Sequence, residues 1–165
     1  MNDKQMDMLR TWLKDAYAME KGIVEVLEKQ IPQFDDMPDA QAKIRQHIDV
    51  TKSHADRVRG CVEQLGDNVS HVKSGMANFL GTVQGLSTMM ADDKVVKNAM
   101  ADYAVEHFEI ASYMAIVAAC REMGHDDIAG ICEKIIDEEM EMANWLKKQL
   151  PMVVKEHTFK TAVKS

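Results

Sequence analysis

Two glutamates interrupt an otherwise apolar stripe in the second half of the chain. The residues of this stripe recur at steps of three or four, which is the spacing of one face of a helix. They are Glu106, Glu109, Tyr113, Ile116 and Cys120. An ionised carboxylate that is buried without a partner is strongly unfavourable, because it gives up its hydration. If this stripe is buried, its glutamates must be protonated, paired with cations or bound to metal.

Other helical stripes also carry polar side chains at core positions. Glu20 and Glu139 each lie between apolar residues at helical steps, and His54 shares its stripe with His47 and Thr51. Four helices that direct acids or imidazoles at one axis can build a paired iron or manganese site. Carboxylates bridge hard cations, and imidazole completes the coordination of iron, manganese or zinc. His47 is expected to be structural or exposed. The predicted metal ligands are Glu20, His54, Glu106, Glu109 and Glu139.

These residues also have a purely structural interpretation. A glutamate in an amphipathic helix is commonly solvated at the edge of the stripe, and a core histidine is commonly hydrogen-bonded within the protein. The chain would then be a non-catalytic, dimeric helical protein whose core acids form a network with His54 and the tyrosines. Replacing such acids by Leu or Gln should stabilise the fold. A third alternative, an iron-storage cage, needs a larger assembly than the sequence indicates.

Four long helices are expected to position the acids and histidines. Apolar residues recur at helical steps, and capping residues, glycines and prolines mark the ends. A shorter helix, over residues 70–88, is predicted in a crossover that lets the third long helix start at the same end as the first. The fold class is therefore all-α, a four-helix bundle with a long crossover containing an additional helix. The predicted long helices run from Asp3 to Pro32, from Pro38 to Gly66, from Asp92 to Met123 and from Asp126 to Pro151.

Length and composition limit the remaining possibilities. The 165 residues are expected to form one domain over 1–151 and a docked or frayed tail over 152–165. A net charge of -7 argues against nucleic acid or an anionic membrane as a partner, since both attract basic surfaces. No apolar run approaches the roughly 18 residues of a membrane span, and the N-terminus lacks a signal-peptide pattern, so a cytoplasmic location is expected. Reduced core thiols are expected at Cys61, Cys120 and Cys132.

Four segments of the chain resemble the YciE/YciF family of bacterial stress proteins, relatives of rubrerythrin in the ferritin-like superfamily. They are Trp12–Lys21, His47–Lys52, Glu106–Tyr113 and Asp137–Leu146, and the similarity extends over residues 5–150. The resemblance implies a ferritin-like bundle with an extra helix in the crossover, a homodimer and a dinuclear iron centre. The family's own activity is poorly defined, so the resemblance indicates fold more than function.

The chain departs from the family pattern at two positions. Val50 stands where the family usually has a carboxylate, and Met142 follows Glu139 where di-iron oxidases have histidine. His54 is the candidate replacement ligand for the missing carboxylate. This pattern leaves open whether the chain binds two metal ions, one or none.

The leading hypothesis is a metal-binding stress protein that oxidises Fe(II) with oxygen or peroxide. In this hypothesis Glu106 bridges the metal ions, Glu20 and Glu139 are terminal ligands, and His54 and Glu109 complete the coordination. Tyr113 or Tyr17 would orient the carboxylates or relay an electron.

Overall fold

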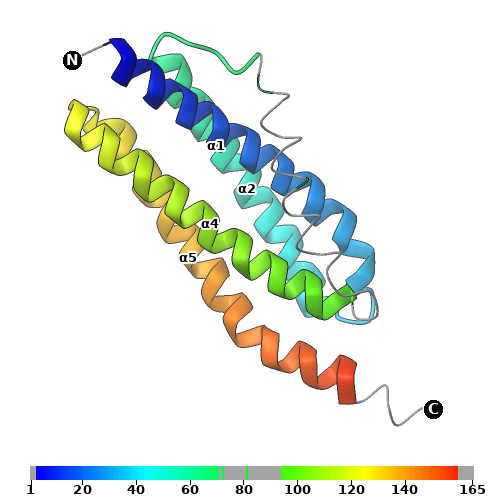
Figure 1. The fold of residues 1–165 in the computed structure, drawn as a ribbon. Helices are drawn as coiled ribbons and strands as arrows, with labels where there is room; N and C mark the ends of the chain where they lie inside the picture. The colour runs from blue at the N-terminus through cyan, green and yellow to red at the C-terminus, as the bar shows by residue number, and fades with distance from the viewer. Residues whose placement is uncertain (1–2, 71, 73–80, 82–93, 160–165) are drawn as a thin grey trace.

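The computed structural model describes residues 3–70, 72, 81 and 94–159, and within these ranges the chain contains helices and no strand. The long helices form a bundle of two hairpins (Figure 1). Each hairpin is antiparallel because its connection is short. Helix α1 also packs on α4, and α2 packs on α5, so that all four helices surround one interior. The helices are α1, Asp3–Gln30, α2, Pro38–Gln64, α4, Lys94–Met123, and α5, Asp126–Val154.

Glycine and proline mark most of the helix ends, as the sequence predicts. Gly66 and Gly124 follow α2 and α4 with φ of 74° and 76°, a left-handed conformation that glycine adopts without a steric penalty. Pro38 occupies the first turn of α2, where its missing N–H has no helical partner to lose. Pro32 ends α1 within a short 3₁₀ helix, Ile31–Phe34.

The predicted end of the fourth helix at Pro151 is wrong. Helix α5 contains this proline, continues to Val154 and passes into a π-helical turn, Lys155–Phe159. Val153 is buried, so the apolar surface that one more turn removes from water outweighs the hydrogen bond that proline cannot donate. The crossover helix predicted over 70–88 and the cap predicted at Asp92 fall almost wholly outside the described residues.

The interior is a single apolar cluster that runs the length of the bundle. Its side chains come from all four long helices, with Leu13, Val58, Ile116 and Ile135 among the most buried. Cys61, Cys120 and Cys132 are free and fully buried, which confirms the expectation of reduced core thiols. Among the described residues, no helix is both long and apolar enough to cross a membrane.

Candidate metal centre

Acids and imidazoles from all four long helices meet inside the bundle. Each side chain takes a core position because the stripe that carries it also carries the apolar residues that pack the helix. Six such side chains are present, and none of them is more than 4% exposed. All five predicted ligands are therefore buried, and so is His47, which was expected to be structural or exposed. They are Glu20 on α1, His47 and His54 on α2, Glu106 and Glu109 on α4, and Glu139 on α5.

One group of three possible ligands lies between α1, α2 and α5. It consists of Glu20, His54 and Glu139, each with a ligand atom within 4.8 Å of the others. His54 Nδ1 is 2.6 Å from Glu139 Oε1 and 3.6 Å from Glu20 Oε2. All three atoms lack a hydrogen-bond partner of suitable direction, although they are close together. Atoms that lie this close together without forming hydrogen bonds are placed as the ligands of a shared cation would be.

A second group lies beside the first, between α2, α4 and α5. His47 Nε2 is 3.0 Å from Glu106 Oε1 and 3.9 Å from Glu139 Oε2, and the three residues again place ligand atoms within 4.8 Å. Glu139 belongs to both groups and turns a different oxygen to each histidine. Glu139 is therefore the carboxylate that the two groups have in common.

Glu109 lies beside these groups as a fourth carboxylate. It is fully buried, and neither of its oxygens has a hydrogen-bond partner in the described part of the chain. Burial raises its pKa well above the ordinary value, and the charges of Glu139, Glu20 and Glu106 raise it further. Buried polar atoms without partners are rare in native proteins. Together the four carboxylates would carry the charge that balances two divalent cations.

The two histidines respond to the same environment in opposite ways. Burial lowers the pKa of His47 to about 4. Burial acts in the same direction on His54, but the carboxylates of Glu139 and Glu20 outweigh it and raise the pKa of His54 to about 10. Desolvation and the charge of Glu139 raise the pKa of Glu106 well above its usual range. Without a metal ion, the imidazolium of His54 thus faces the carboxylate of Glu139, whose pKa lies below its usual value because His54 outweighs the effect of burial.

A second layer of residues fixes the orientation of the possible ligands. The hydroxyl of Tyr113 donates a hydrogen bond to Glu20 Oε1. Glu138 Oε2 lies 2.7 Å from His54 Nε2 and is also bound by Arg57. Partners of this kind set the tautomer of a ligating imidazole and leave its other nitrogen for the metal. Tyr113 therefore occupies the supporting position expected for a tyrosine.

The sequence offered a signal for His47 but none for Glu138. His47 shares the apolar stripe of His54, seven residues away, so its burial follows from the same periodicity. Glu138 is partly exposed, and its role depends on where α2 places His54 and Arg57. Val50, at the position of the missing carboxylate, is partly exposed, and His47 and His54 lie about one turn to either side of it.

These residues fit a pair of divalent metal ions. The donor set has carboxylates that can bridge and imidazoles that can complete coordination. Several of the atoms that would ligate are buried without a hydrogen-bond partner among the described residues, namely Glu20 Oε2, His47 Nε2, His54 Nδ1 and both oxygens of Glu139. A buried polar centre on four facing helices defines this chain as a ferritin-like four-helix bundle protein with a possible metal site.

Residues 4–158 match the family model described as a domain of unknown function, DUF892, and the chain belongs to this family. A protein of Xanthomonas campestris is similar in structure, with a TM-score of 0.80 and 30% identity over 96% of this chain and 99% of that one. YcfI of Rhodopseudomonas palustris, which is described as a candidate structural protein, has a TM-score of 0.73 and 28% identity, covering 87% of this chain and 92% of its own.

The chain is also similar to a bacterioferritin with a diiron site, from Desulfovibrio desulfuricans. The TM-score is 0.76 and the identity 20%, over 99% of this chain and 90% of the bacterioferritin. At that identity the likeness shows the fold, and the ligand set of this chain must be argued from its own residues.

Proposed function

We propose that this protein binds a pair of divalent metal ions, iron in the first place, at the centre of the bundle. The observation that carries the proposal is the position of Glu139, whose two oxygens each face a different histidine and carboxylate. Glu20 and His54 would hold one ion, and His47 and Glu106 the other. Glu109 would supply the remaining charge and ligand atoms. Manganese and zinc suit the same donors.

An iron pair bound there would supply the one-electron chemistry for oxidation of Fe(II) by oxygen or peroxide. The protein's residues have three tasks in this activity. His54 gives up the proton on Nδ1 when a metal ion binds and keeps its other nitrogen on Glu138. Tyr113 holds Glu20 in place through its hydroxyl. The apolar cluster around the site excludes bulk water, which strengthens every charge interaction inside.

Metal content distinguishes the shared ligand from the others. We expect the protein, loaded anaerobically with Fe(II) and desalted, to retain about two ions per chain. Glu139→Gln should lose both ions, because it removes a ligand from each group, whereas His47→Ala should keep one. Glu141→Gln, an exposed acid on the same helix, is the matched control and should retain both. A parent protein that binds no metal would refute the proposal.

One observation favours a different function. His54 lies near three carboxylates, and Tyr113 bonds to Glu20, which is the network expected of a purely structural protein. The relative YcfI is also described as structural. The two functions differ in their response to chelators, because a structural network loses no stability when metal is removed.

We further propose a cytoplasmic homodimer that serves in stress protection, as the resemblance to the YciE/YciF proteins suggests. Helix α4 supports the dimer, because the face that it turns away from the bundle is also apolar. Met100, Phe108 and Met114 on this face are half exposed or more. An apolar surface along a helix is typical of a contact between proteins. Ala111→Glu, on the same face, should therefore shift the mass measured by light scattering from dimer to monomer.

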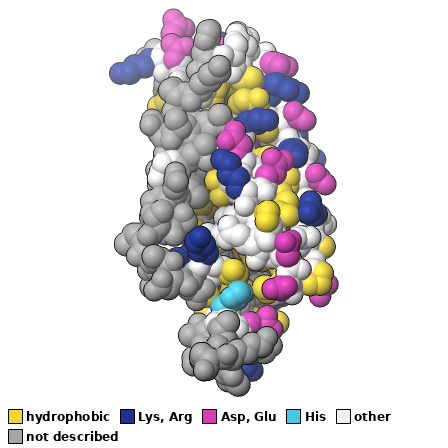
Figure 2. Space-filling view, turned by 90° about the vertical axis from the view of Figure 1, so that its right-hand side faces the viewer, with side chains coloured by type: hydrophobic (Ala, Val, Ile, Leu, Met, Phe, Trp, Pro, Cys, Tyr) yellow, Lys and Arg dark blue, Asp and Glu magenta, His cyan; other side chains and the backbone are white. Residues whose placement is uncertain are grey.

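One face of the molecule bears on the question of a nucleic-acid partner. On the face in Figure 2, the Lys and Arg side chains of the described residues are interspersed with Asp and Glu and form no broad basic patch. Nucleic acid binding needs such a patch.

A further inference from the structure

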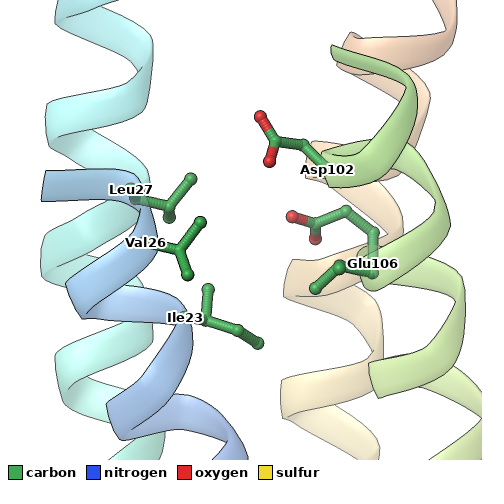
Figure 3. A pocket seen from close by; sticks show the side chains of 6 residues that line it. Ile23, Val26, Leu27, Asp102 and Glu106 are labelled. Atoms are coloured by element: carbon green, nitrogen blue, oxygen red, sulfur yellow. The ribbon is translucent and has the colours of Figure 1, made fainter. Parts of the chain in front are cut away.

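A small pocket lies between α1 and α4, next to the metal centre. Its volume of about 10 Å³ is the size of one water molecule. The rim is at Val26, which is partly exposed, while the other lining residues are buried. The pocket therefore lies between a partly exposed residue of α1 and a carboxylate of the centre. It is lined by Ile23, Val26, Leu27, Asp102, Val105 and Glu106 (Figure 3).

Two carboxylates form the polar wall of this pocket. Asp102 and Glu106 lie one helical turn apart on α4, and Figure 3 shows both pointing from α4 toward α1. Asp102 is 7% exposed and Glu106 is 2% exposed. Both are thus at least nine-tenths buried, at positions where an ionised carboxylate needs a positive partner.

Both carboxylates have few polar partners among the described residues. Asp102 Oδ1 accepts a hydrogen bond of 3.1 Å from Gln30 Nε2, and Asp102 has no ion pair within the described ranges. Glu106 presents Oε1 to His47, while its Oε2 is buried without a hydrogen-bond partner. Glu106 therefore has one oxygen beside His47 and a second, buried oxygen without a hydrogen-bond partner, and it lines the same pocket as Asp102.

We propose that this pocket is the port through which a divalent cation enters the metal centre, with Asp102 as the outer carboxylate and Glu106 as the inner one. The inference rests on the proposed function and adds the route. A helical turn separates the two acids by about 5.4 Å, so that a cation can pass from one to the other in one short step. The apolar remainder of the lining strengthens the attraction, because it keeps the local dielectric constant low.

The rate of loading tests this inference separately from the binding equilibrium. Metal-free protein is mixed with Co(II) alone, and the ligand-field absorbance of bound Co(II) is followed by stopped flow. At pH 8, above the pKa of about 7 that burial gives Asp102, the Asp102→Asn variant should load about tenfold more slowly, because an acidic cleft raises the on-rate of a cation by at least this factor. It should reach the same final number of ions per chain, since Asp102 is not a final ligand. Val26→Phe, which narrows the rim, should slow loading without removing a charge.

The control is Asp49→Asn, which removes an equal charge from an exposed position on α2 and should load at the parent rate. The port is refuted if both pocket variants load as fast as the parent. It is also refuted if Asp102→Asn binds fewer ions at equilibrium, since Asp102 would then be a ligand of the centre. A parent that takes up no Co(II) would overturn the proposed function itself, and the parent alone reveals this.

Discussion

His54 is the residue whose charge decides how the centre behaves without metal. Its burial favours the neutral ring, but the carboxylates of Glu139 and Glu20 raise its pKa to about 10. At neutral pH the imidazolium therefore stands where a metal ion would otherwise balance the acids. Binding of a metal ion at Nδ1 must displace this proton, so metal affinity and proton release are linked.

Proton release can be counted directly. At pH 7.5 we expect saturating Co(II) to release about one or more protons per chain, the first from His54, because its carboxylate neighbours raise the pKa of the imidazole to about 10. The measurement is a titration in weak buffer with a pH indicator. Glu141→Gln should release as many protons as the parent. Binding of Co(II) with no change in pH would contradict this assignment of charges.

Asp102 provides a second prediction, on stability. Burial raises its pKa to about 7, against an ordinary value of 3.8. A raised carboxyl pKa means that the folded state holds the proton more tightly than the unfolded state does. Its contribution to stability is therefore present below about pH 3.8 and is lost as the pH rises through 7. The difference between the two pKa values corresponds to about 4 kcal/mol.

Asp102→Asn should remove this dependence. In the metal-free protein at pH 8, we expect the variant to unfold at higher urea concentration than the parent, with a gain that shrinks toward zero at pH 4. The comparison requires urea unfolding curves at several pH values. Asp49→Asn, at an exposed site, should leave the pH dependence of the parent unchanged. An Asp102→Asn protein that is less stable than the parent at pH 8 would show that the acid has a charged partner.

At the scale of the helices, particular residues determine the short connections as well as the interior. Gly66 and Gly124 allow α2 and α4 to end in a left-handed residue, and His125 alone separates Gly124 from the start of α5. This tight turn fixes α4 and α5 side by side, and with them Glu106 and Glu139.

A pair of glycine substitutions tests this role. Gly124→Ala should destabilise the protein by about 1–2 kcal/mol, because alanine is strained at a φ of 76°. Gly130→Ala is the matched control, since Gly130 lies within α5 and an added Cβ there meets no atom within 4 Å. It should be neutral or stabilise by up to about 1 kcal/mol. Thermal unfolding of both variants provides the comparison, and equal effects would contradict the argument.

The helical periodicity of the sequence was the main basis on which this architecture could be predicted. The step of three or four residues placed Glu106, Glu109 and Tyr113 on one buried face of α4, and all three lie there. It could not predict that Glu138 contacts His54 or that Glu139 lies near both histidines, because these contacts depend on how α2 and α5 are rotated toward each other. The continuation of α5 beyond Pro151 depends likewise on a tertiary contact, the burial of Val153.

At the scale of the whole molecule, the centre lies where all four long helices meet. A metal ion bound there should therefore hold the two hairpins together. Glu20 and Glu106 come from different hairpins, and both groups of ligands also include Glu139 on α5. A cation bound by these residues would join helices that otherwise meet through apolar contacts and a few hydrogen bonds. Metal binding is therefore linked to the stability of the entire bundle and not only to local order.

Chelation should consequently lower the unfolding temperature of the whole protein. A ligand present at a thousand times its dissociation constant stabilises the folded state by about 4 kcal/mol, since it does not bind the unfolded chain. We expect calorimetry to show one transition at higher temperature for Fe(II)-loaded protein under anaerobic conditions, and a lower one after EDTA and desalting. Restoring the metal should restore the higher value. Glu139→Gln should melt at the same temperature with and without metal, because it lacks the shared ligand. A parent protein whose transition is unmoved by EDTA would favour the structural network over the metal centre.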